Sequence, residues 1–109
     1  MKLHEMHLIH SLMETHELSN HISSEKLNGQ RVHVITGPGR MIMLTKHPHY
    51  FHISMNYESR PIGVELDLNL NLVSLDTGKW SLSDEDLLLR KDFEEKIKSW
   101  LPAGLGFGK

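Results

Sequence analysis

The 109-residue chain carries 12 Lys and Arg against 14 Asp and Glu, a formal net charge of −2, and it contains no cysteine. A composition of 39% hydrophobic and 24% charged residues is typical of one globular domain. It excludes disulfide and thiolate chemistry, offers no apolar run near the ~18 residues of a membrane span, and lacks the dense basic face that DNA or RNA binding needs. The N-terminus has no continuous apolar segment like that of a signal peptide, so we expect a cytoplasmic protein.

Histidine is the unusual residue in this composition. The chain has nine histidines, and all of them lie between His4 and His52. Because imidazole gains a proton below about pH 6.5, the N-terminal half becomes more positive in mild acid. This histidine-rich half is therefore the first place to look for metal binding or pH-dependent behaviour.

Residues 2–18 have the apolar spacing of an amphipathic helix. Its predicted buried stripe consists of Met6, Ile9, Leu12, Met13 and His16, with Leu8 at the border. Its outer face carries a ladder of histidines three residues apart: His4, His7 and His10. We expect a short helical turn to follow, from Ser23 or Ser24 to Asn28-Gly29, since glycine suits the left-handed backbone at a helix end.

Alternation of apolar and polar residues predicts four β-strands. They span residues 32–36, 40–45, 50–57 and 62–72. The first two join in a tight hairpin at Gly37-Pro38-Gly39. The last strand alternates without a break, as a strand with one buried face requires, and residues 58–61 connect it to the third. That four-residue loop predicts a register with these opposite pairs: Phe51 and Leu68, Ile53 and Leu66, His52 and Asp67.

Ser83 begins the final predicted helix, whose first turn carries three carboxylates that oppose the positive end of the helix dipole. Its buried stripe consists of Leu89, Phe93, Ile97, Trp100 and Leu101, and Pro102 ends it. The chain is thus predicted to be a single α+β domain over residues 1–103, in the order α-β-β-β-β-α. Its four-stranded, mostly antiparallel sheet has both helices on one face, and residues 104–109 form a flexible glycine-rich tail.

Two motifs that look catalytic fail on their spacing. Residues 16–21 resemble the HExxH motif of zinc hydrolases, but Asn20 stands where the second histidine must lie to share the helical face. The C-terminal GLGFGK lacks the preceding strand, the Ser or Thr and the following helix of a phosphate-binding loop. Neither motif supports an enzymatic function.

The densest cluster of chemically active side chains is His47, His49 and His52. With Asp67 predicted opposite His52, these residues could supply the nitrogen and oxygen ligands that zinc accepts. The same pattern also fits exposed histidines beside a surface His–Asp pair. Both interpretations stay open at the level of sequence.

Several features then follow in a fixed order: the stretch His47-Pro48-His49-Tyr50-Phe51-His52, a strand, the turn Asp76-Thr77-Gly78, Leu82 and a helix that ends in Trp100. Over residues 39–101 this order resembles a group of small uncharacterised bacterial proteins, often encoded beside a second small gene. In that group a His-Pro-Pro-His-Phe-His stretch precedes the strand. Here Tyr50 is extra, the long strand is longer and the N-terminal helix is unmatched. The resemblance implies a small intracellular protein that acts through a partner, with no established reaction.

We predict a small non-enzymatic interaction or regulatory module, of antitoxin-like, immunity or phage-inhibitor type, that binds a protein partner through the open polar face of the sheet. The predicted partner-binding residues are His52, Ser54, Asn56, Glu65, Asp67 and Asn69. The alternative is a metal-binding protein or metal-dependent enzyme whose divalent ion, such as zinc, is held by His47, His49, His52 and Asp67. The first hypothesis needs no cofactor. A homodimer is also predicted, through the outer strand edges and Trp80.

Overall fold

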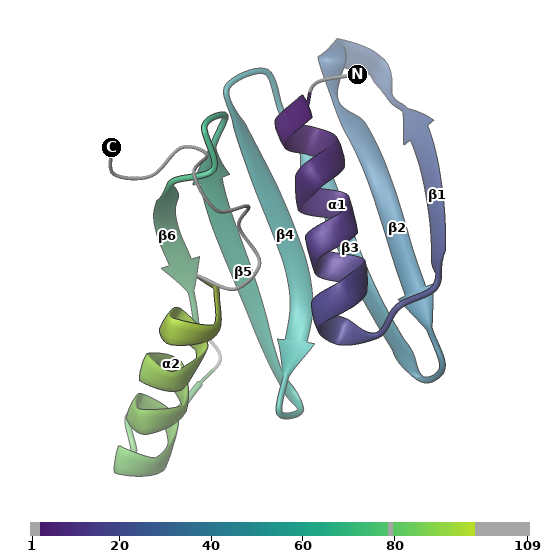
Figure 1. Ribbon diagram of the computed structural model, residues 1–109. Helices are drawn as coiled ribbons and strands as arrows, with labels where there is room; N and C mark the ends of the chain where they lie inside the picture. The colour runs from purple at the N-terminus through teal and green to yellow at the C-terminus, as the bar shows by residue number, and fades with distance from the viewer. Residues whose placement is uncertain (1–2, 79, 98–109) are drawn as a thin grey trace.

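The computed structural model describes residues 3–78 and 80–97, which form one continuous sheet and two helices (Figure 1). In chain order the elements are α1 (Leu3–His16), β1 (Asn20–Glu25), the short 3-10 turn η1 (Leu27–Gly29), β2 (Arg31–Gly37), β3 (Arg40–Lys46), β4 (Tyr50–Tyr57), β5 (Arg60–Asp67), β6 (Leu72–Asp76) and α2 (Asp84–Ile97). The strands lie in the order β1-β2-β3-β4-β5-β6, and every neighbouring pair is antiparallel. The predicted α+β class and antiparallel sheet are confirmed. The predicted number of strands is wrong, because this sheet has six; the predicted tail, 104–109, lies outside the described residues.

The first additional strand, β1, begins before the segment that we predicted as a short helical turn and includes the first residues of that segment, and only Leu27–Gly29 is helical, as the 3-10 turn η1. Asn28 and Gly29 have φ angles of 69° and 77°, and such a left-handed pair reverses the chain. β1 consequently folds back along β2, with Asn20 opposite Thr36. The Asn-Gly pair ends the 3-10 turn η1, as predicted, and it also lies in the connection between β1 and β2, which was not predicted. The polar sequence of β1 has too little apolar alternation to reveal an edge strand.

The second additional strand arises because the long predicted strand, residues 62–72, is divided by a turn. The Asp67 carboxylate accepts hydrogen bonds from the backbone N–H groups of Asn69 and Asn71, each at 2.9 Å, and from Nδ2 of Asn71 at 3.1 Å. Leu70 adopts a φ of 69° within this turn, yet its side chain is fully buried. Asp and Asn side chains compete with the strand ladder in this way, so an unbroken apolar alternation did not mean an unbroken strand.

The pairing of β4 with β5 differs from the predicted register by two residues. Phe51 lies opposite Leu66 and Ile53 opposite Val64, while His52 faces Glu65 instead of Asp67. The cause is the loop, which contains two residues rather than four. Because side chains in a strand alternate with a period of two, a shift of two leaves each residue on its predicted face.

The two-residue loop between β4 and β5 consists of Glu58 and Ser59, which have φ angles of 50° and 68°. Such left-handed pairs favour Asn-Gly, because other residues pay a steric cost there. We expect the double substitution Glu58→Asn with Ser59→Gly to raise the free energy of unfolding by about 1 kcal/mol. Urea denaturation measures the change. A loss of stability would mean that the loop does not need the left-handed conformation.

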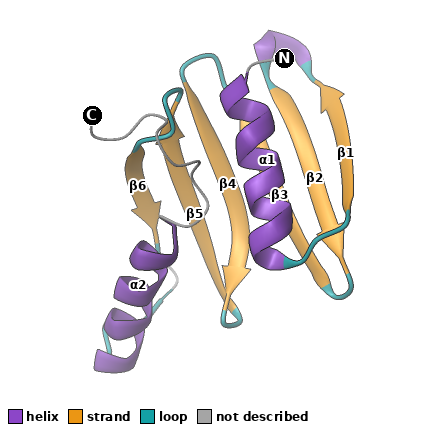
Figure 2. Ribbon diagram, in the orientation of Figure 1, coloured by secondary structure: helices purple, strands orange, loops and turns teal. Residues whose placement is uncertain are grey.

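Both helices pack against the same face of the sheet, as predicted. Leu8, Ile9 and Leu12 of α1 are fully buried, and Figure 2 shows this helix crossing the face of β3. The ring of Phe93 in α2 lies 4.8 Å, centroid to centroid, from the ring of Tyr57 in β4. Tyr57 alternates in phase with the buried residues of β4, so its ring points to the side that α1 covers.

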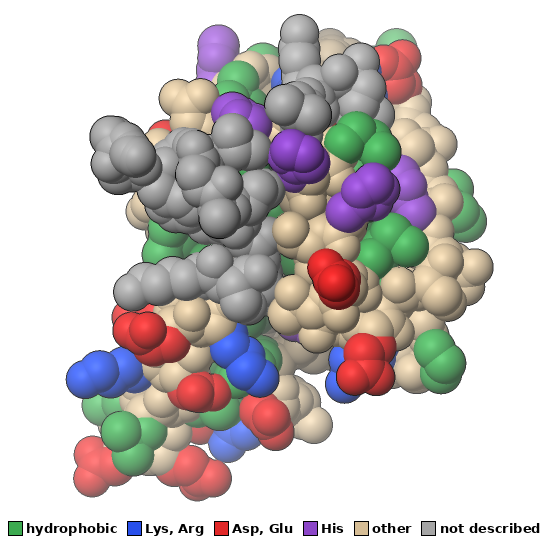
Figure 3. Space-filling model, viewed as in Figure 1, with side chains coloured by type: hydrophobic (Ala, Val, Ile, Leu, Met, Phe, Trp, Pro, Cys, Tyr) green, Lys and Arg blue, Asp and Glu red, His purple; other side chains and the backbone are tan. Residues whose placement is uncertain are grey.

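The predicted outer ladder of histidines on α1 is wrong in two of its three positions. Nδ1 of His4 donates a 3.1 Å hydrogen bond to the carbonyl oxygen of Leu68, because a carbonyl oxygen can only accept. His7 is half-buried, and its Nδ1 has no hydrogen-bond partner among the described residues. His10 is exposed. Figure 3 views this helix-covered face and shows histidine side chains around α1, with acidic and basic side chains mixed over α2.

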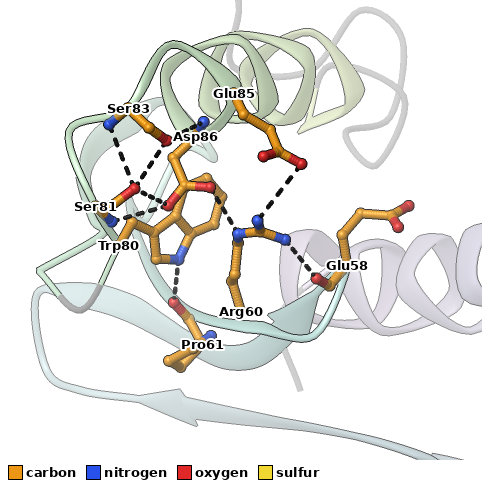
Figure 4. Close-up of polar contacts among 8 residues, drawn as sticks. All are labelled: Glu58, Arg60, Pro61, Trp80, Ser81, Ser83, Glu85 and Asp86. Carbon is orange, nitrogen blue, oxygen red and sulfur yellow. Dashed lines mark hydrogen bonds and ion pairs between the residues drawn. The ribbon is translucent and has the colours of Figure 1, made fainter.

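A polar cluster anchors the start of α2 to β5 (Figure 4). Nε of Arg60 donates to Oδ1 of Asp86 at 2.8 Å, and Oδ2 of Asp86 accepts from the backbone N–H and the hydroxyl of Ser81, both at 2.8 Å. The Ser81 bonds, and the positive charge of Arg60, lower the pKa of the Asp86 carboxyl. The indole N–H of Trp80 donates to the carbonyl oxygen of Pro61 at 2.7 Å.

Ser83 caps α2 as predicted, because its hydroxyl accepts a 3.2 Å bond from the backbone N–H of Asp86. Phe93 and Ile97 are buried and Leu89 packs against the core, which confirms this part of the predicted stripe. Trp100, Leu101 and Pro102 lie outside the described residues. Neither described helix has the length and apolar character that crossing a bilayer requires.

Candidate interaction surface

The outward side of the sheet, opposite α1 and α2, is here called the open face. Neither described helix packs over it, and the ring of His47, from the loop between β3 and β4, stacks on Tyr50 at one end of it. Alternation and register assign it these residues: Asn20, Ile22 and Ser24; Val32, Val34 and Thr36; Met41, Met43 and Thr45; Tyr50, His52, Ser54 and Asn56; Pro61, Gly63, Glu65 and Asp67; Ser74 and Asp76.

One half of the open face, on β1, β2 and β3, is apolar. Ile22 is 65% exposed, Met41 56% and Met43 39%, whereas Val32 and Val34 are half-buried between them. The register places Ile22 opposite Val34 and Val34 opposite Met43, so these side chains form one row across three strands. We call this half the apolar patch. The prediction of a wholly polar open face is wrong here, because it considered only β4 and β5 and left out the outward positions of β2 and β3 as well as the unpredicted β1.

The other half of the open face is acidic. It carries Glu65 and Asp67 of β5 and Asp76 of β6, and the described strands place no lysine or arginine on this side. Although partial burial opposes it, hydrogen bonding from Asn71 and Asn69 lowers the pKa of the Asp67 carboxyl, which keeps the group ionised at neutral pH.

The basic residues of the strands lie on the helix-covered side, where three arginines have partners. Arg31 donates to Glu5 of α1, Arg40 donates to the carbonyl oxygen of His16 at 2.6 Å, and Arg60 donates to Asp86. Lys46 alternates in phase with the buried Leu44. The sheet therefore separates charge between its two sides, and the open face is the negative one.

Five of the six predicted partner-binding residues lie together on the open face: His52, Ser54, Asn56, Glu65 and Asp67. The sixth, Asn69, lies in the turn between β5 and β6 and donates its backbone N–H to Asp67. The ring of His52 extends across the sheet over Gly63, because a Cβ atom added to Gly63 would lie 3.2 Å from Nε2 of His52. Glycine at this position leaves room for the imidazole.

The predicted metal ligands have separate surroundings. Nδ1 of His47 hydrogen-bonds to Nε2 of Gln30 at 3.0 Å, and its ring stacks on Tyr50 with centroids 4.3 Å apart. His49 is exposed, and His52 and Asp67 lie in different rows of the open face. Among the described residues, no three His, Asp or Glu side chains are placed to hold one ion. The metal site stays a prediction.

A buried polar network between α1, β1 and β2 was not predicted. Glu5 and His33 are both fully buried, and Nε2 of His33 lies 2.6 Å from Oε2 of Glu5. Nη1 of Arg31 donates to both oxygens of Glu5, at 3.1 and 3.2 Å. Glu5 lies one helical turn before Leu8 and Ile9, and this spacing places it on the buried side of α1. The prediction left it out of the buried stripe because its side chain is a carboxylate.

The network continues from His33 to His21 of β1. Nδ1 of His33 and Nε2 of His21 are 2.8 Å apart, and the ring centroids are 4.9 Å apart. The centroid separation is close to the sum of the N···N distance and the two ring radii, so the two nitrogens point directly at each other. This geometry is that of an N–H···N hydrogen bond, whereas two metal ligands would converge on a point beside both rings. Burial, and then the nearby His33 and His10, lower the pKa of His21.

A cleft of about 640 Å³ opens at the other end of α1. Its lining includes His16, Arg40, Tyr57 and Lys96. Burial lowers the pKa of His16 from 6.5 to about 4, and the positive charges of Arg40 and Lys96 add to this effect. His16, which was predicted on the buried stripe of the helix, is half-buried.

The lowered pKa of His16 predicts a loss of stability in acid. His16 takes up a proton near pH 6.5 in the unfolded chain and near pH 4 in the folded chain. The contribution of neutral His16 to the free energy of unfolding is therefore fully present above pH 6.5 and is lost as the pH falls toward 4. We expect His16→Asn to remove about 1–2 kcal/mol of this decline, less than the full shift because solvent screens a half-buried ring. Urea denaturation across this pH range measures it.

A second variant provides the control for the His16 prediction. Arg40→Gln removes one of the two cations that lower the His16 pKa, so the acid decline should become shallower but should persist. If wild type and His16→Asn decline in parallel, His16 is not protected from protonation by the fold.

Comparison of the chain with protein-family models, with curated proteins and with solved structures finds no match in any of the three. The resemblance of residues 39–101 to small bacterial proteins therefore stays a prediction. What the geometry does define is a class: an α+β protein whose antiparallel meander is covered by helices on one side and carries an apolar and acidic open face on the other.

Proposed function

We propose that the protein is a small interaction module that binds a protein partner through the open face. The observation that carries the proposal is the apolar patch, since a sheet that only needed to be stable in water would place polar residues at these exposed positions. Ile22 and Met41 each expose more than half of their surface. Contiguous exposed apolar side chains rimmed by polar ones are the usual composition of a docking site.

The polar half of the open face would supply specificity to the same contact. His52, Ser54, Asn56 and Glu65 present hydrogen-bonding groups beside the apolar patch, as the polar rim of an interface does. Under this proposal the protein acts by occupying or sequestering its partner, which fits the antitoxin-like, immunity or inhibitor types. For the alternative metal-dependent function, the described residues show no set of three side chains placed to hold one ion.

Site-specific photo-crosslinking tests the proposal. A photoreactive amino acid is placed at Met43 on the open face or, as the matched control, at Leu88 on α2, an apolar side chain that is 68% exposed on the helix-covered side. Cells of the source organism that express each variant are irradiated, and adducts are identified by mass spectrometry. We expect one defined protein to crosslink from position 43 and not from position 88.

Binding must then be reproduced with the identified protein in purified form. The double variant Ile22→Ser with Met43→Ser should weaken that binding at least about tenfold, which corresponds to ~1.4 kcal/mol. Circular dichroism verifies that the variant is folded. Crosslinking of the same protein from both positions, or from position 88 alone, would overturn the proposal.

A further inference from the structure

The open face has a charge and a shape that restrict what can dock on it. We infer that its occupant is a cationic amphipathic helix of the protein partner, and this inference rests on the proposed function. Its apolar side would cover the apolar patch, and its lysine or arginine side would face Glu65 and Asp67.

The backbone of the open face favours a helix over an extended segment. The interior strands of the sheet are hydrogen-bonded on both sides, so their N–H and C=O groups are engaged within the sheet. An extended peptide adds to a sheet through free backbone groups at an edge. The open face offers side chains instead, and an amphipathic helix presents a stripe of side chains to such a surface. The opposite face of the same sheet already accepts a helix, α1, in this manner.

The apolar patch has the width and length of a short helix. The row of Ile22, Val34 and Met43 crosses three strands, or about 10 Å at the usual strand spacing. Along β2 the patch extends from Val32 to Thr36, about 13 Å at the usual rise. A helix with its side chains is about 10–12 Å in diameter, and two to three turns cover this length. The patch therefore matches a short helix that lies along the strands.

The charge of the open face favours a basic segment. Glu65 lies in the same row as Val32, Thr45 and His52, two strands beyond β3 and thus about 10 Å from it. Lysine or arginine on the flank of a docked helix would reach over β4 toward that carboxylate. The described strands carry three acidic residues and no lysine or arginine on the open face, so a cationic helix is attracted and an anionic one is repelled. Two copies of the open face would also repel each other.

Designed peptides of known charge test the inference. The probes are a helical peptide of leucine and lysine of about 14 residues, or roughly four turns, its counterpart with glutamate for every lysine, and a scrambled leucine-lysine peptide without helical periodicity. Titration calorimetry measures affinity, and amide chemical shifts locate the contact. We expect the leucine-lysine helix to bind, to shift β1 to β5 amides, and to weaken with added salt.

Charge-reversal variants locate the contact. Glu65→Lys should reduce affinity for the leucine-lysine helix at least about tenfold. Glu14→Lys, the same charge change at an exposed position on α1, should change it less than about twofold. The pair Ile22→Ser and Met43→Ser should reduce it at least about tenfold, whereas Leu88→Ser should not.

Three outcomes would overturn the inference. Equal binding of the lysine and glutamate helices would make the open face an apolar surface without charge preference. Stronger sensitivity to Glu14→Lys than to Glu65→Lys would place the contact on the helix-covered side. A wild-type dimer by light scattering that Ile22→Ser with Met43→Ser converts to a monomer would make a second copy the occupant. A partner crosslinked from position 43 would still support the proposed function when no peptide binds, so the two proposals fail separately.

Discussion

Replacing Glu5 with alanine is expected to lower the free energy of unfolding by about 3–5 kcal/mol, enough to unfold a marginally stable domain. The carboxylate is fully buried and bonds to both Arg31 and His33. Its removal leaves His33 buried beside an arginine without the charge that stabilises both, and buried polar groups without partners are costly. Urea denaturation of Glu5→Ala at neutral pH measures the loss.

The matched control for this prediction is Glu25→Ala. Glu25 also accepts from Arg31, at 3.2 Å, but its side chain is 74% exposed, so its loss should cost at most about 1 kcal/mol. The double variant Glu5→Leu with His33→Leu should lose less free energy of unfolding than the sum of the losses of the two single variants. Removal of both buried partners leaves fewer unsatisfied groups. Equal effects of Glu5→Ala and Glu25→Ala would contradict the packing of α1 on β2.

Phe93→Ala is the second substitution with a large expected effect, a loss of about 3–5 kcal/mol. The side chain is fully buried and its ring packs at 57° against that of Tyr57, a tilted aromatic arrangement that adds to the burial. The truncation leaves a cavity between α2 and β4. Thermal and urea unfolding of the variant measure the loss, and hydrogen exchange should show faster opening of α2.

Leu88→Ala provides the comparison on the same helix. Leu88 is 68% exposed, so its truncation should change stability by less than about 0.5 kcal/mol. If the two variants lose similar amounts, α2 does not pack through the Phe93 side, and the helix-covered side of the sheet would be incomplete. The open face would then lose the contrast on which its assignment as an interaction surface depends.

The candidate surface was only half visible in the sequence. The polar positions of β4 and β5 could be placed on one face because strand alternation survives a register shift of two residues. The apolar patch was missed because β2 and β3 carry apolar residues on both of their faces, so that alternation alone does not show which face is outward. Ile22 joins the row of Val34 and Met43 only through the pairing of β1 with β2, and the polar sequence of β1 did not predict that strand. The acidic character of the open face likewise became evident only from the structure, because Arg31, Arg40 and Arg60 all lie on the helix-covered side.

The sequence by itself determined the features that depend on neighbouring residues: the helices around α1 and α2, the cap at Ser83, and the buried faces of β4 and β5. Only the tertiary structure decided the number of strands, the register after the Glu58-Ser59 loop, and the burial of Glu5 with His33. The physical reason is that periodicity reports which side of an element is apolar. Where a turn takes left-handed φ angles, and which distant group neutralises a buried charge, depend on contacts between residues far apart in the chain.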